Sequence, residues 1–281
     1  MTLKIYTQAP LPFTGQKRRF VTPFKALLNA HIPGDGADWT ILDAFGGSGL
    51  LAHVAKRTKP AARVIYNDYD GYVERLAHIA DTNRLRHILD SMTSHLPRNK
   101  PIPPVERERV RQAIRDFDGY RDLDCLASWL LFSGKQAPDL EWLLRTDLYH
   151  VLRRSDYPQA DDYLQGLEIV REDYTTLLPQ YLDNPRCLLV LDPPYVCTMQ
   201  GAYRKAGYFG MVAFLRLMTM VRPPFVFFSS TRSELLGYLD FVVSERVAGW
   251  ERLIGYQTIT AKVALNMNSN YEDNLVYRFG D

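Results

Sequence analysis

The chain of 281 residues has only three cysteines, Cys125, Cys187 and Cys197. They are odd in number, far apart and without the spacing of metal ligands, which argues against a disulfide framework and a cysteine metal site. No run approaches 18 apolar residues, and no basic-then-apolar leader opens the sequence. Neither a membrane span nor a secretory signal is predicted. We therefore expect a reduced, cytoplasmic protein without a bound metal.

Neither sign of charge dominates the sequence. The 34 Lys and Arg residues and 32 Asp and Glu residues give a net charge of +2, which is too small to indicate a nucleic-acid partner by itself. The distribution is uneven, with nine Lys or Arg against five Asp or Glu from Arg84 to Arg121. We find no internal repeat or coiled-coil heptad. An apolar content of 46% and this length suit an α/β domain with an inserted subdomain, or two small domains.

One apolar stretch, residues 188–191, runs directly into Asp192, Pro193, Pro194 and Tyr195. An apolar run bounded by proline predicts a buried parallel strand, and ligands of open α/β sheets bind just beyond the carboxyl ends of such strands. The prolines stiffen the backbone and carry no N–H. The Asp192 carboxylate and the Pro193 carbonyl could each accept one N–H of a planar amine, with the Tyr195 ring against its face. At this point an ordinary proline turn is the alternative.

A glycine-rich turn lies early in the chain. The predicted strand 40–45 leads into Gly46-Gly47-Ser48-Gly49 and then into a predicted helix, 50–55. The N–H groups at the start of such a helix can bind an anionic part of a ligand. The turn lacks the Gly-Lys-Ser/Thr ending of a phosphate loop, and its spacing differs from the dinucleotide fingerprint. A βα turn without a ligand is the alternative.

These two motifs resemble the signatures of amino-methyltransferases that use S-adenosylmethionine. Asp43, Phe45, Gly47 and Gly49 match Asp-x-Phe-x-Gly-x-Gly, and Asp192 begins Asp-Pro-Pro-Tyr. The chain resembles in particular the Dam-like, D12 class of site-specific DNA adenine methyltransferases. The resemblance implies a Rossmann-like α/β fold with a mixed, mostly parallel seven-stranded sheet. It also implies a monomer that binds S-adenosylmethionine and methylates the N6 amine of a flipped-out adenine in double-stranded DNA.

The resemblance extends to the basic segment 12–19, which in the family folds back over the cofactor. It implies that Phe13 and Lys17 contact S-adenosylmethionine, the lysine through the cofactor carboxylate. Many relatives carry Trp where this chain has Phe13. A solvated basic turn is the alternative for the segment taken alone.

Two further acids follow predicted strands. Asp68 ends the strand 63–67, about 19 residues after Gly49, where a doubly wound fold places the acid that binds a ribose diol; Asp70 is the competing candidate. By resemblance, Asp173 accepts a hydrogen bond from the cofactor's adenine amine, with Glu172 as the alternative. Asp43, Phe45, Gly47, Gly49 and Asp192 complete the predicted cofactor contacts.

The βα alternation stops over residues 83–163, which predicts a mainly helical subdomain inserted between the two parts of the catalytic domain, 1–82 and 164–281. Helical patterns cover 105–117, 123–132 and 140–152 around a proline-rich loop, 97–104. The resemblance implies that this insert recognises the DNA target. For any single arginine, a solvated helix face is the alternative. The predicted DNA contacts are Arg84, Arg107, Arg109, Arg111 and Arg115, and after the catalytic loop Tyr203, Arg204 and Lys205.

After that loop we predict a helix, 211–220, a strand, 225–229, and an antiparallel closing strand, 275–279. Relatives tend to have an asparagine soon after the serine that ends the strand 225–229. This chain has Ser230-Thr231-Arg232 there.

Other methyl acceptors share the catalytic tetrapeptide. RNA adenine and protein glutamine methyltransferases use the same chemistry, but the inserted region favours DNA. Cytosine-amine methyltransferases more often have Ser in place of Asp192. A nucleotide-binding dehydrogenase would need an uninterrupted dinucleotide fold.

Overall fold

The computed structural model describes residues 5–196, 209–230, 234–266 and 269–280. The chain divides into two compact units. The first unit comprises Met1–Gln8, Gly15–Asp70 and Asp162–Asp281, and the second unit comprises Ala9–Thr14 and Gly71–Asp161. The second unit therefore begins at Gly71, before the predicted boundary at residue 83, and it includes a short piece from the N-terminal region.

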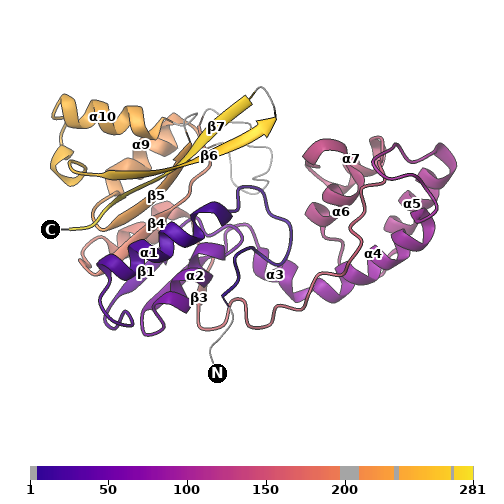
Figure 1. Cartoon of the computed structure of the whole chain (residues 1–281), viewed down its shortest axis with the longest axis horizontal. Coiled ribbons are helices and arrows are strands. Elements are labelled where there is room, and N and C mark those ends of the chain that lie inside the picture. The colour runs from indigo at the N-terminus through magenta and orange to yellow at the C-terminus, as the bar shows by residue number, and fades with distance from the viewer. Residues whose placement is uncertain (1–4, 197–208, 231–233, 267–268, 281) are drawn as a thin grey trace. The chain divides into compact units, whose positions relative to one another are not determined.

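The first unit is built on a seven-stranded sheet (Figure 1). The strand order is β3-β2-β1-β4-β5-β7-β6. Strand β7 pairs antiparallel with both β5 and β6, and the pairs among β1 to β5 are parallel. This is the predicted α/β architecture with a mixed, mostly parallel sheet. The strands are β1 (Thr40–Asp43), β2 (Arg63–Asn67), β3 (Glu168–Val170), β4 (Cys187–Leu191), β5 (Phe225–Ser230), β6 (Gln257–Asn266) and β7 (Ser269–Arg278).

The central strands form because short apolar runs can be buried on both faces. Every residue of β1, β4 and β5 is buried, as expected for parallel strands covered on both sides by helices. Phe24 packs against Phe228 of β5 on the face covered by α1, whereas Phe227 belongs to the core beneath α9 and α10. The helical elements are η1 (Arg18–Phe20), α1 (Val21–His31), α2 (Leu50–Thr58), α8 (Tyr174–Leu177), η3 (Leu178–Tyr181), α9 (Met211–Met220), α10 (Leu235–Ser244) and η4 (Trp250–Arg252).

The second unit is helical. Its elements are α3 (Tyr72–Ala77), α4 (Ile79–Thr93), α5 (Pro104–Asp116), α6 (Leu123–Leu130), η2 (Phe132–Gly134) and α7 (Leu140–Arg145). Asp122 caps α6 by accepting a hydrogen bond from the Cys125 amide at 2.8 Å, and it also pairs with the buried Arg75 at 2.8 Å. One carboxylate thus fixes a helix start and a buried cation, and removing Arg75 would leave the buried Asp122 without its cation; Arg75 itself also pairs with Asp124 at 2.9 Å.

The predicted helix over 140–152 is wrong in its second half. Helix α7 ends at Arg145, and the residues that follow are drawn into backbone pairing with other segments. The Tyr149 amide donates to Leu130 O, and the Ile102 amide donates to Leu148 O, both at 2.8 Å. These tertiary hydrogen bonds outweigh the local helix propensity of an apolar, leucine-rich stretch.

In the described part of the chain, each helix is either too short or too polar to cross a membrane.

Candidate functional site

The two motifs meet at one edge of the sheet, because the strands that carry them are neighbours. Strand β1 pairs in parallel with β4, and Asp43 lies opposite Val190, two residues before Asp192. The Ala44 amide donates to Val190 O at 3.1 Å and extends this pairing beyond β1. The chain continues from β1 to one side of the sheet and from β4 to the other. The loops after Asp43 and Leu191 therefore open at the switch point, where ligands of such sheets bind.

The glycine turn is closed by backbone geometry that glycine allows. Gly47 and Gly49 have φ values of 49° and 71°, in the left-handed region that favours glycine. The Gly49 amide donates to Gly46 O at 2.7 Å, and Gly49 immediately precedes α2. The turn thus leads into the N–H groups of the first turn of α2, which have no partner within that helix.

Tyr66 of β2 packs against the glycine turn and donates a hydrogen bond to it. Its buried ring lies under Gly46, and its hydroxyl donates to Gly47 O at 2.7 Å and is 3.0 Å from Asp68 Oδ1. Sequence reasoning missed this residue. A buried tyrosine two positions before the strand-end acid was the available signal.

We expect Gly46→Ala to disrupt this turn. A Cβ atom at residue 46 would lie 2.3 Å from a carbon of the Tyr66 ring, and Tyr66 is fully buried and cannot move aside. Overpacking of this kind costs about 1–3 kcal/mol of folding free energy, and ligand binding at the turn should be lost. Chemical denaturation and calorimetry with the cofactor check both effects. The control is Gly237→Ala in α10, where an added Cβ atom would have no neighbour within 4 Å. Equal losses of folding stability and of cofactor affinity in the two variants would contradict this account.

Asp43 is a buried carboxyl whose oxygens have no hydrogen bond of normal length and angle in the described part of the chain, although the Ala52 amide lies near enough to lower its pKa. It is 1% exposed. Burial, and then the negative charge of Asp192, raise the pKa of Asp43 to about 8, whereas the Ala52 amide and Lys17 oppose the rise. A buried polar group left in this state costs free energy. It is therefore suited to a ligand that brings a cation or an N–H donor.

Lys17 forms an ion pair with Asp192, the predicted catalytic carboxylate. Its Nζ is 2.7 Å from Asp192 Oδ2, and the two side chains are 10% and 18% exposed. The same ammonium donates to Gly15 O at 2.9 Å and lies 5.6 Å from the centre of the Tyr195 ring. Burial raises the pKa of Asp192, and Lys17 opposes that rise. The lysine thus helps to keep Asp192 charged.

In this structure the N–H donor at the loop after β4 is Lys17, which the sequence predicted as a contact of the cofactor carboxylate. The Lys17 ammonium binds the Asp192 carboxylate and lies over Tyr195, while Pro193 and Pro194 are buried.

The other predicted cofactor contacts are distributed over both units. Asp68 is 5% exposed beside the glycine turn. Asp173 caps α8 by accepting from the Thr175 amide at 2.8 Å, and the alternative, Glu172, accepts from Gln180 Nε2 at 2.9 Å. Phe13 belongs to the second unit, where it packs edge-on against Tyr72 at 5.9 Å.

Phe45 lies in an aromatic cluster that the sequence did not predict. Its ring centre is 5.4 Å from Tyr174 and 6.1 Å from Phe209. Phe45 follows β1, and Tyr174 begins α8 just after β3. The cluster therefore gives this edge of the sheet, beside the glycine turn, an apolar wall.

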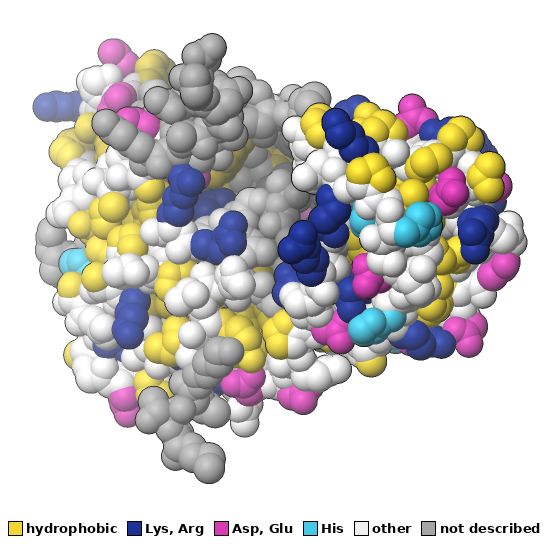
Figure 2. Space-filling view, turned by 45° about the vertical axis from the view of Figure 1, so that its right-hand side comes forward, with side chains coloured by type: hydrophobic (Ala, Val, Ile, Leu, Met, Phe, Trp, Pro, Cys, Tyr) yellow, Lys and Arg dark blue, Asp and Glu magenta, His cyan; other side chains and the backbone are white. Residues whose placement is uncertain are grey.

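Most of the arginines predicted to contact DNA are paired with acids inside the second unit. Arg84 pairs with Asp81 and Asp118, and Arg107 pairs with Asp147. Figure 2 shows Lys and Arg side chains beside Asp and Glu on the surface of this unit. Arg111 and Arg115 share Glu108, whereas Arg109 is exposed. Tyr203, Arg204 and Lys205 lie outside the described residues.

Comparison with known proteins identifies the family. No protein-family model matches the chain. A protein of Haemophilus influenzae named "Putative methyltransferase" is 47% identical over 277 residues, which cover 98% of this chain and 94% of that protein. The chain belongs to this methyltransferase family. A solved precorrin-6y C5,15-methyltransferase of Geobacter metallireducens covers 94% of the methyltransferase described here, which covers 90% of that chain, at 11% identity and a TM-score of 0.36. The fold assignment of the methyltransferase depends on its own strand order and not on that similarity.

Proposed function

We propose that this methyltransferase transfers a methyl group from S-adenosylmethionine to the exocyclic N6 amine of adenine in double-stranded DNA. The observation that carries the proposal is the position of Asp192. It follows β4, next to the glycine turn after β1, and it holds an N–H donor over Tyr195.

The cofactor edge fits S-adenosylmethionine on the chemistry of its donor groups. The buried Asp43 carboxyl suits the cofactor's ammonium, and the first N–H groups of α2 suit its carboxylate. Asp68 suits the ribose hydroxyls, and Phe45 with its aromatic neighbours suits the adenine ring. When bound, the cofactor supplies an electrophilic methyl group on a sulfonium.

Asp192 and the Pro193 carbonyl would act on the acceptor amine. The lone pair of an adenine amine is delocalised into the ring, so the nitrogen is a poor nucleophile. Two acceptors draw the N–H bonds toward tetrahedral geometry and oppose the positive charge that grows during transfer. The amine would share the Asp192 carboxylate with Lys17, since a carboxylate accepts several hydrogen bonds. An adenine inside a duplex cannot reach this loop and must be flipped out, with Tyr195 as its stacking partner.

Offering different acceptors with labelled S-adenosylmethionine tests the proposal. We expect label in duplex DNA and background counts in RNA and in glutamine-containing protein substrates. Label in RNA or protein instead would assign the same carboxylate chemistry to one of those acceptors and would overturn the DNA assignment.

Asp43→Asn should weaken cofactor binding and stabilise the free protein at high pH. The charge-assisted contact to the cofactor's ammonium is worth about 1.5–3 kcal/mol, or about 10- to 100-fold in affinity. The folded pKa of Asp43 lies near 8, above its usual value near 4. Folding stability from this group is therefore lost as the pH rises from about 4 to about 8.

Denaturation of both proteins across that pH range, with calorimetry of cofactor binding, checks the two effects. The stability advantage of the variant should vanish near pH 4, where Asp43 is protonated in both folded and unfolded protein. Unchanged cofactor affinity would exclude Asp43 from the cofactor site.

A further inference from the structure

Two neighbouring segments of the second unit bring four cations together. Residues 98–101 lie antiparallel to 149–152: the Asn99 amide donates to His150 O and the His150 amide donates to Lys100 O, both at 2.9 Å. The Arg98 guanidinium donates to Leu152 O across the same pairing. We call Arg98, Lys100, Arg153 and Arg154 the basic strip. Three of its members, Lys100, Arg153 and Arg154, are exposed.

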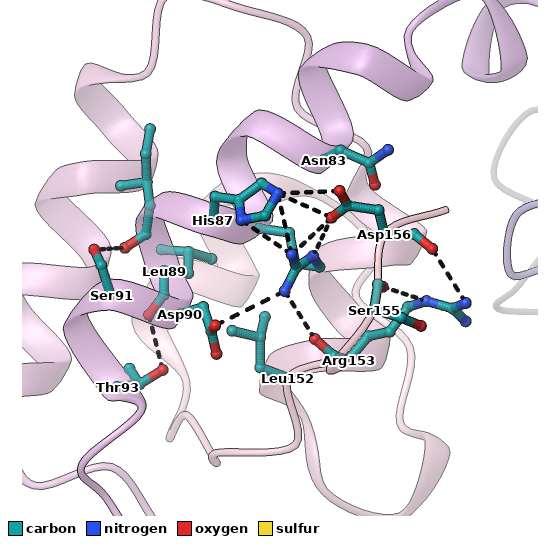
Figure 3. Close-up of polar contacts among 12 residues, drawn as sticks. Asn83, His87, Leu89, Asp90, Ser91, Thr93, Leu152, Arg153, Ser155 and Asp156 are labelled. Carbon is teal, nitrogen blue, oxygen red and sulfur yellow. Dashed lines mark hydrogen bonds and ion pairs between the residues drawn. The ribbon is translucent and has the colours of Figure 1, made fainter. Parts of the chain in front are cut away.

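Helix α4 fixes the segment that carries Arg153 and Arg154. Asn83 clamps the backbone of Tyr157, accepting from its amide at 2.8 Å and donating to its carbonyl at 2.9 Å. The buried Arg86 donates to Arg153 O at 3.2 Å and to Asp156 Oδ1 at 2.6 Å. Figure 3 shows Arg153 and Asp156 beside His87 and Asp90 of this helix. The strip is therefore held on a backbone fixed from beneath and is not carried on a free loop.

The acid in the same segment as Arg153 and Arg154, Asp156, is already paired with a cation of α4. Asp156 is bound by Arg86 and lies 3.1 Å from His87 Nε2, and these contacts hold the pKa of Asp156 below its usual value. Arg153 donates to Ser155 O at 2.7 Å and stacks 4.5 Å from the centre of the Tyr157 ring. Within the described residues, no strip cation forms an ion pair with an acid. Three of the four arginines of α5 differ, because Arg107, Arg111 and Arg115 have carboxylate partners; the fourth, Arg109, is exposed.

We propose that the basic strip, and not the arginine-rich helix α5, binds the phosphates of double-stranded DNA. The partner class follows from the proposed function, on which this inference rests. Cations without carboxylate neighbours gain most from a polyanion, because each phosphate contact releases condensed counterions from the duplex. The exposed large apolar side chains of the second unit belong to other positions, Ile88, Val105, Phe132 and Trp142, so the strip has no apolar group to insert into a lipid surface.

The test compares two double variants with the same change of charge. Arg153→Gln/Arg154→Gln removes two strip cations, and Arg111→Gln/Arg115→Gln removes two cations that are paired with Glu108. Binding of the full chain to a fluorescent duplex is measured over a series of salt concentrations. The slope of log K against log salt changes by about 0.9 for each phosphate contact. We expect a slope shallower by about 2 in the strip variant and the wild-type slope in the α5 variant.

A wild-type slope in the strip variant, or equal losses in both variants, would overturn the inference. So would unchanged duplex binding together with lost binding to phosphatidylserine vesicles. Wild-type methyl transfer to the same duplex is measured in parallel. If the duplex is methylated but the strip variant keeps its slope, the inference fails and the proposed function stands. If the strip variant shows the shallower slope of log K against log salt but the wild type transfers no methyl group to DNA, the proposed function fails and the inference stands.

Discussion

Asp192→Ala is expected to lower the rate of methyl transfer by at least about 10²-fold while leaving cofactor binding within a few-fold of wild type. The Asp192 carboxylate is the acceptor that would polarise the substrate amine, and losing one pre-organised electrostatic contact of this kind costs about 10²–10³-fold in rate. The proposed contacts of the cofactor lie elsewhere, at Asp43, Asp68 and the start of α2. Single-turnover transfer from labelled S-adenosylmethionine, with calorimetry of cofactor binding, separates the two effects.

The control for that variant concerns Lys17. Removing Asp192 takes away the carboxylate that lies 2.7 Å from the Lys17 ammonium, which is 10% exposed, and the loss of a close partner of a largely buried charge is destabilising. Asp192→Ala/Lys17→Met should recover part of the stability and none of the activity. Recovery of activity in this double variant, or full activity in Asp192→Ala, would remove Asp192 from the chemistry.

Lys17→Met is expected to move the acidic limb of the pH–rate profile to higher pH. Burial raises the pKa of Asp192, and the charge of Lys17 lowers it again. The negative charge of Asp273 adds a smaller rise. Without Lys17 the carboxylate needs a higher pH to ionise, so activity should fall at neutral pH and return as the pH rises. Each unit of pKa shift lowers the ionised fraction about tenfold on the acidic limb.

Several charged groups surround this pair, and they determine the controls. Asp43 interacts with both Asp192 and Lys17, and Asp273 interacts with Lys17 and Arg19. Lys17→Arg keeps the positive charge and should keep the wild-type limb. If Lys17 acts only on the cofactor, Lys17→Met would raise the KM for the cofactor and leave the limb in place. That outcome would contradict the role assigned here to its contact with Asp192.

The central strands of the sheet were predicted well because each of them is specified by a short apolar run of its own sequence. The apolar runs of β1, β2, β4 and β5 have one stable environment, a core covered on both faces. Helix α9 was predicted from 211 to 220 and occupies Met211–Met220. Strand β6 was not predicted. It lies at the end of the sheet and pairs only with β7, so its residues do not form the continuous apolar run of a central strand.

The contacts that define the candidate site were harder to predict, because they join distant parts of the chain. Lys17 was predicted as a cofactor contact from the resemblance, but its contact with Asp192 depends on how the segment around it folds against the end of β4. The arginines of α5 were predicted as DNA contacts because the resemblance places target recognition in the insert and this helix is rich in arginine. Whether an arginine such as Arg107 is free depends on Asp147, which reaches it only through the fold.

The most direct measurement of the central claim identifies the atom that receives the methyl group. Unmethylated DNA of mixed sequence is incubated with the protein and labelled S-adenosylmethionine, hydrolysed to nucleosides and separated by liquid chromatography with mass detection. The carboxylate and carbonyl after β4 predict label in N6-methyldeoxyadenosine. Label in a methylated cytosine would contradict the account. So would the absence of label from every nucleoside of the DNA, if the protein is shown to bind the cofactor.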